Sequence, residues 1–164
     1  CTLIKHLYAA RRNVAVLRGG NQGFGNRERI DVWWSGLKGN GGLMKILAYL
    51  LQTNLEWHDA QVRVNVVAAD DEEGEERRRT VGPVLDQLRT GATLNVIEAD
   101  GRVFDEIIHD SSAEADIVFL GMATPDEEDD YVSYYTRLHE RTAGLPPTVF
   151  VLAAEEISFR EVLA

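Results

Sequence analysis

The sequence predicts an α/β fold, a three-layer sandwich with helices on both faces of a mostly parallel sheet. Short runs rich in β-branched and aromatic residues alternate along the chain with segments of helical periodicity. The runs are mostly continuously apolar, which is typical of strands covered on both faces. Right-handed crossovers between parallel strands place helices on both sides of such a sheet.

Six segments are expected to be strands because each is short, apolar and rich in β-branched or aromatic side chains. They are Val14 to Leu17, Ile30 to Trp34, Val62 to Ala69, Thr93 to Ile97, Asp116 to Gly121 and Thr148 to Ala153. Trp33 and Trp34 are neighbours on one strand and should point to opposite faces, where both are buried under helices or one anchors an interface.

The clearest helix carries an apolar stripe with i, i+3, i+4 spacing, formed by Leu43, Ile46, Leu47, Leu50 and Leu51. Three further segments repeat this spacing. They contain Val81, Val84, Leu85 and Leu88; Val103, Phe104, Ile107 and Ile108; and Tyr131, Tyr135, Leu138 and Thr142. A last helix-like stretch, Ile157 to Leu163, either covers the sheet or reaches a partner.

Three parts are expected along the chain. Residues 1–18 form the closing helix and strand of a preceding lobe, and residues 30–164 form the main α/β lobe. Residues 19–29 carry four glycines and no apolar periodicity, so they are expected to be a flexible connection. The chain begins with Cys1 and not with methionine, which we interpret as a piece of a larger polypeptide.

Charge and composition exclude several classes of function. The chain has 27 acidic and 17 basic residues, a net charge of -10 and a pI near 4.8, which disfavours binding to nucleic acid and to anionic lipid. One cysteine allows neither an internal disulfide nor a multi-thiolate metal site. The longest apolar stretch, Leu43 to Leu51, is far shorter than the roughly 20 residues that span a bilayer.

An acidic run followed by three arginines occupies Asp70 to Arg79. On a helix, Glu73 would meet Arg77 and Glu75 would meet Arg79 at i, i+4. A solvated helix start is the plain interpretation, and an electrostatic switch or docking surface is the alternative.

No catalytic or metal-binding residue is assigned. The four histidines do not stand at a spacing that makes a helical metal pair, and no serine stands in a G-x-S-x-G elbow. The histidines are His6, His58, His109 and His139. The chain is therefore not expected to be an enzyme, although a hydrolase or transferase with a carboxylate base is a third hypothesis.

A glycine-rich segment between a strand and a helix is the one candidate binding site. Its candidate anion- or nucleotide-binding residues are Ser35, Gly36, Gly39, Gly41 and Gly42. Backbone N–H groups in this context can cradle a phosphate. The segment matches neither G-x-G-x-x-G nor G-x-x-x-x-G-K-[ST], and a tight turn also needs glycine, so a plain turn is the alternative.

Acidic residues are expected at the carboxyl ends of the strands, where open parallel sheets bind ligands. They are Asp70, Asp71, Asp100, Asp126, Glu127 and Glu128. Such an edge opposes a bare triphosphate unless a divalent cation intervenes, or it is simply the hydrophilic rim of a noncatalytic domain.

Two stretches carry a family resemblance. The first, Arg29 to Val67, reads R-I-D-V-W-W, a short glycine-rich loop, G-G-L-M-K-I-L-A-Y-L-L and W-H-D-A-Q-V-R-V-N-V-V. It resembles the cytosolic C-terminal domain of the cation-chloride cotransporters, the Na-K-Cl and K-Cl cotransporters. The matching positions are Ile30, Asp31, Val32, Trp33, Trp34, Gly41, Gly42, Leu43, Tyr49, Leu50, Leu51, Trp57, Arg63 and Val64.

The second stretch comprises Ala115 to Met122 and Leu145 to Leu152, which are similar to the family's A-D-L-V-L-L-N-M and L-P-P-x-V-x-L-V strands. Asn40 departs from the family, whose turn has aspartate, and the long phosphorylation-bearing insertions of animal members are missing. These departures suggest a compact prokaryotic homologue.

The resemblance implies a noncatalytic, universal-stress-protein-like or Rossmann-like domain on the cytoplasmic side of the cell membrane. It would follow the transmembrane transport domain of the same polypeptide and contribute to homodimer assembly and regulation. Nucleotide binding is associated with this domain in some relatives, so the alternative is an ATP-sensing domain that uses Ser35 to Gly42 and Asp31. The universal stress proteins' own G-x-x-G, nine residues, G-[ST] pattern is absent.

Overall fold

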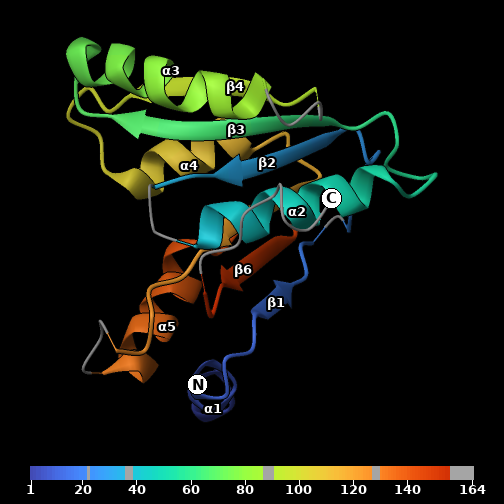
Figure 1. The fold of residues 1–164 in the computed structure, drawn as a ribbon, viewed down its shortest axis with the longest axis vertical. Coiled ribbons are helices and arrows are strands. Elements are labelled where there is room, and N and C mark those ends of the chain that lie inside the picture. The colour runs from blue at the N-terminus through green and yellow to red at the C-terminus, as the bar shows by residue number, and fades with distance from the viewer. Residues whose placement is uncertain (22, 36–38, 87–90, 127–129, 156–164) are drawn as a thin grey trace.

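The computed structural model describes residues 1–21, 23–35, 39–86, 91–126 and 130–155. Helices and strands alternate along most of these ranges (Figure 1). The helices are α1 (Thr2–Ala9), α2 (Asn40–Gln52), α3 (Asp71–Asp86), α4 (Phe104–Ser112) and α5 (Tyr131–Arg141). The strands are β1 (Val14–Arg18), β2 (Arg29–Trp33), β3 (Gln61–Ala68), β4 (Thr93–Glu98), β5 (Ile117–Gly121) and β6 (Thr148–Leu152).

The six expected strands are confirmed, with ends that differ by at most one residue. Helices α2, α3, α4 and α5 contain most of the four segments with apolar periodicity, and Val103 and Thr142 lie one residue outside α4 and α5. Leu88 and the stretch Ile157 to Leu163 lie outside the described residues.

The six strands form one sheet in the order β1-β6-β5-β2-β3-β4. All neighbouring strands are parallel except β1, which pairs antiparallel with β6 and places Val14 opposite Leu152. The chain moves from β2 through β3 to β4 on one side, and its next strand, β5, lies on the other side of β2. The strand order therefore reverses between β2 and β5, and this topological switch point is where open α/β sheets bind ligands.

The sheet separates two apolar cores, which confirms the three-layer α/β fold. On one face α2 and α3 pack on side chains that include Val32 and Val64. On the other face α1, α4 and α5 pack on side chains that include Val118 and Phe150. Figure 1 shows the strands following one another from β4 and β3 at the top to β1 at the bottom, where α1 lies.

The acidic run starts α3 as the sequence predicts. The N–H of Glu73 donates to the Asp70 carboxylate at 2.9 Å, and Glu73 accepts the Ala69 N–H at 2.7 Å. These bonds satisfy backbone donors that a helix start leaves unpaired. The expected ion pair between Glu73 and Arg77 forms at 2.9 Å.

The prediction of an ion pair between Glu75 and Arg79 is wrong. The Glu75 carboxylate pairs with Arg78 at 2.6 Å, while Arg79 Nε donates to the carbonyl oxygen of Glu75 at 3.3 Å. Residues three and four apart are both neighbours on a helix surface, so either arginine can reach this carboxylate.

The glycine-rich connection, residues 19–29, is tied to the start of β5. The carboxylate of Asp116 accepts the N–H groups of Asn26, Glu28 and Arg29 at 3.1, 2.7 and 2.9 Å. The division into residues 1–18, 19–29 and 30–164 stays a prediction.

Candidate functional site

The glycine-rich segment lies at the carboxyl end of the sheet, between β2 and the start of α2. Ser35 follows β2, Gly39 is the residue before α2, and Gly41 and Gly42 lie in its first turn. Gly36 lies outside the described residues. The strand-to-helix context that the sequence indicates is therefore present at the four described positions.

Steric constraints in the fold explain why two of these positions are glycine. Gly39 has φ +84°, a conformation that L side chains rarely adopt, and a Cβ there would lie 3.2 Å from the carbonyl oxygen of Glu155. A Cβ at Gly41 would lie 3.1 Å from two ring atoms of Trp34. The absence of a side chain thus permits close packing at both positions.

Asn40, between these glycines, fastens α2 to the ends of two strands. Its Nδ2 donates to the carbonyl oxygen of Met122 at 2.6 Å, and its Oδ1 accepts the N–H of Ala153 at 2.8 Å. The side chain is buried. The sequence singled out Asn40 only as a departure from the family's aspartate, whereas the structure gives both ends of its amide a partner.

Lys45 is the one lysine or arginine on α2. Its Nζ lies 4.6 Å from the centroid of the Trp34 ring, within the range of a cation–π contact. Burial lowers the pKa of Lys45 because the protein solvates the ammonium less well than water does. The aromatic ring thus keeps the lysine beside the first turns of α2.

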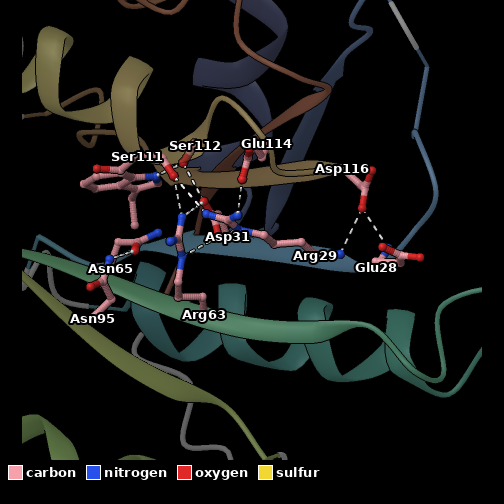
Figure 2. Close-up of polar contacts among 11 residues, drawn as sticks. Glu28, Arg29, Asp31, Arg63, Asn65, Asn95, Ser111, Ser112, Glu114 and Asp116 are labelled. Carbon is pink, nitrogen blue, oxygen red and sulfur yellow. Dashed lines mark hydrogen bonds and ion pairs between the residues drawn. The ribbon is translucent and has the colours of Figure 1, made fainter.

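A buried polar network links β2, β3 and the end of α4, and it was not predicted (Figure 2). Asp31 is fully buried, and its two oxygens accept from Arg63 Nε at 3.0 Å and Nη2 at 2.7 Å. Ser112 Oγ donates to Asp31 Oδ2 at 2.7 Å and accepts from Trp33 Nε1 at 2.9 Å. These bonds stabilise a carboxylate that would otherwise be costly to bury.

Two further side chains extend this network. Arg63 also donates to the carbonyl oxygen of Ser111. Arg29 lies 3.7 Å from Asp31 and 3.3 Å from Glu114, on the more exposed side of the cluster. Asp31, Trp33 and Arg63 are among the positions that carry the family resemblance, and Arg29 begins the matching stretch. Hydrogen bonds of these four residues with Ser111 and Ser112 hold the sheet to α4.

The acidic rim lies where the sequence indicates, with Asp70 and Asp71 after β3, Asp100 after β4 and Asp126 after β5. Hydrogen bonding with Asp71 and its negative charge raise the pKa of Glu98, at the end of β4. Glu127 and Glu128 lie outside the described residues. Within the described ranges, no three His, Cys, Asp or Glu side chains form a group that could hold a metal ion.

None of the helices in the described part of the chain is long and apolar enough to cross a membrane. Residues 21–100, about half of the chain, match the family model of Solute carrier family 12. The match runs from the connection before β2 to the end of β4, so it contains the R-I-D-V-W-W strand, the glycine-rich turn and Arg63. The match confirms, over this part of the chain, the resemblance to solute carrier family 12, the cation-chloride cotransporters.

Proposed function

We propose that this chain is a noncatalytic domain that regulates and dimerises a cation-chloride cotransporter-like membrane protein from the cytoplasmic side. The family match across residues 21–100 carries the proposal. The geometry supports it, because a buried polar cluster joins secondary-structure elements: Asp31 on β2 binds Arg63 on β3 and Ser112 on α4. Its partner is the transmembrane transport domain of the same polypeptide, where transport itself takes place.

The coding sequence tests the attachment to a transport domain. Several apolar segments of about 20 residues in the same reading frame would support it. A frame without such segments on either side would overturn it, because a free-standing domain cannot regulate a transporter as part of one polypeptide.

Light scattering after size-exclusion chromatography tests dimerisation by this chain. A mass of about twice 18.3 kDa is expected at high protein concentration. A mass of 18.3 kDa at every concentration would overturn self-association through this domain.

A nucleotide-sensing domain is the second candidate. The observation in its favour is the start of α2 at the carboxyl end of the sheet, where Gly39 and Gly41 allow the backbone to approach neighbouring groups closely. Lys45 lies one turn further along α2 and adds a positive charge. Ser35 and Gly42 would complete the site. Titration calorimetry with ATP and magnesium tests it: saturable heat at millimolar concentration supports nucleotide sensing, and a flat titration overturns it.

A further inference from the structure

A small cavity of about 150 Å³ opens at the carboxyl end of the sheet, between the end of β2 and helices α3 and α4. Five of its lining side chains are apolar, and three of these are aromatic: Trp33, Trp34, Val67, Phe104 and Leu120. Val67 lies on β3 and Leu120 on β5, the two neighbours of β2. The cavity therefore lies at the topological switch point, the usual ligand position in an open α/β sheet.

The aromatic walls are held in place before any ligand arrives. Trp33 donates its ring N–H to Ser112 and meets Phe104 edge to face, with ring centroids 5.4 Å apart. Trp34 has Lys45 over its ring, and its backbone N–H donates to the carbonyl oxygen of Asn65 at 2.9 Å. A preformed pocket of this kind loses little conformational entropy on binding.

Ser35 and Arg77 supply the polar groups of the cavity. Arg77 carries the only formal charge among the described residues that line it. One guanidinium nitrogen, Nη2, donates to Glu73 at 2.9 Å, and the Ala69 N–H anchors Glu73 in turn at 2.7 Å. A guanidinium has five N–H donors in a fixed planar fork, so the contact with Glu73 leaves further donors for a second acceptor.

We propose that this cavity binds a small planar aromatic carboxylate, with its ring against Trp33, Trp34 and Phe104 and its carboxylate on Arg77. The volume fits one ring, since an apolar cavity of about 150 Å³ accommodates benzene. The charge of Arg77 and the hydroxyl of Ser35 match the acidic group. This inference rests on the cavity alone and does not depend on the role in a transporter.

Benzoate is the probe for the test, and the three tryptophans report where it binds. In a nitrogen-15 correlation spectrum of the 164-residue chain, the indole signals of Trp33 and Trp34 should shift on titration. That of Trp57, which packs against Phe24 and is not among the residues that line the cavity, should not. The substitution Trp57→Phe identifies its signal. A ligand with so few non-hydrogen atoms should bind with a Kd on the order of 0.1 to 10 mM.

Arginine variants on α3 test the assigned charge. Arg77→Gln should weaken benzoate binding by roughly tenfold or more, because a hydrogen bond between charged groups is lost. Arg79→Gln is the matched control: this exposed arginine on the same helix is not among the lining residues, and its variant should bind benzoate as the wild type does. Benzyl alcohol, which has the ring without the charge, should bind more weakly and should not distinguish Arg77→Gln from wild type.

Three results would overturn the proposal. The first is the absence of a saturable shift at Trp33 and Trp34 up to about 20 mM benzoate, beyond the range expected for this ligand size. The second is an equal shift at Trp57, which would mean general association with aromatic surface. The third is an equal loss of affinity in Arg77→Gln and Arg79→Gln, which would place the carboxylate elsewhere.

Discussion

Replacing Arg63 by methionine should destabilise the fold more than any loss of a surface charge. Asp31 has no exposed surface, and Arg63 supplies two of its hydrogen bonds. Arg63→Met keeps most of the apolar stem but leaves the carboxylate with the Ser112 hydroxyl and with Arg29, 3.7 Å away. Removing one partner of a buried ion pair costs about 3 to 5 kcal/mol, and we expect a loss in this range.

Asp31→Asn should cost less, about 1.5 to 3 kcal/mol, the contribution of a hydrogen bond to a charged group. The Arg63 side chain is 20% exposed and also donates to the Ser111 carbonyl, so its charge can reach water when the carboxylate is gone. In the Asp31→Asn background, Arg63→Met should then cost at most about 1 kcal/mol more, because no buried charge is left unpaired.

Urea unfolding followed by tryptophan fluorescence and far-ultraviolet circular dichroism measures these free energies. Arg78→Met is the matched control, because it removes an exposed pair with Glu75 that contributes about 0 to 1 kcal/mol. Equal losses in Arg63→Met and Arg78→Met would refute the reasoning. So would additive losses for Arg63→Met and Asp31→Asn, since the two side chains would then not be coupled.

Three further predictions concern the edge of the sheet. Gly39→Ala should lower the free energy of unfolding in urea by about 1 to 2 kcal/mol because the φ of Gly39 is positive. Gly82→Ala, inside α3 with open space around it, should instead raise the free energy of unfolding by up to about 1 kcal/mol. An unchanged stability in Gly39→Ala would contradict the backbone argument. Asn40→Ala should cost about 2 to 5 kcal/mol, since two backbone groups lose their buried partner, and a loss below 1 kcal/mol would be inconsistent with this. Glu98→Gln should raise the Tm at pH 7. Asp71 raises the pKa of Glu98 in the native protein, so the wild-type protein loses stability as the pH rises above 4.5, the ordinary pKa of a glutamate. The gain in Tm should vanish below that pH, and a gain that does not depend on pH would refute the prediction.

The fold follows from local patterns, which is why the sequence predicts so much of it. The run Ile30 to Trp34 carries apolar side chains on both faces, and the structure buries Trp33 in one core while Trp34 packs against the other. Leu43, Leu47 and Leu51 of the predicted stripe lie on the face of α2 that packs on the sheet, whereas Leu50 is exposed. Neither observation needs knowledge of distant contacts.

The polar network was missed because it depends on register. Asp31 and Arg63 are each conspicuous in an apolar strand, and a buried charge demands a partner. The parallel pairing of β2 with β3 places them directly opposite each other, and α4 brings Ser112 to the same carboxylate. The sequence could have paired the two charges by their signs, but it contains no signal for the serine.

The glycine-rich turn shows a different limit. A phosphate cradle and a tightly packed turn need the same residue for the same reason, since both require backbone to approach something closely without a Cβ. The structure separates the two requirements, because Gly39 is explained by its positive φ and Gly41 by the Trp34 ring. These two glycines would therefore be required even if no anion ever bound there, so evidence for a ligand must come from polar groups such as Lys45 and from titration.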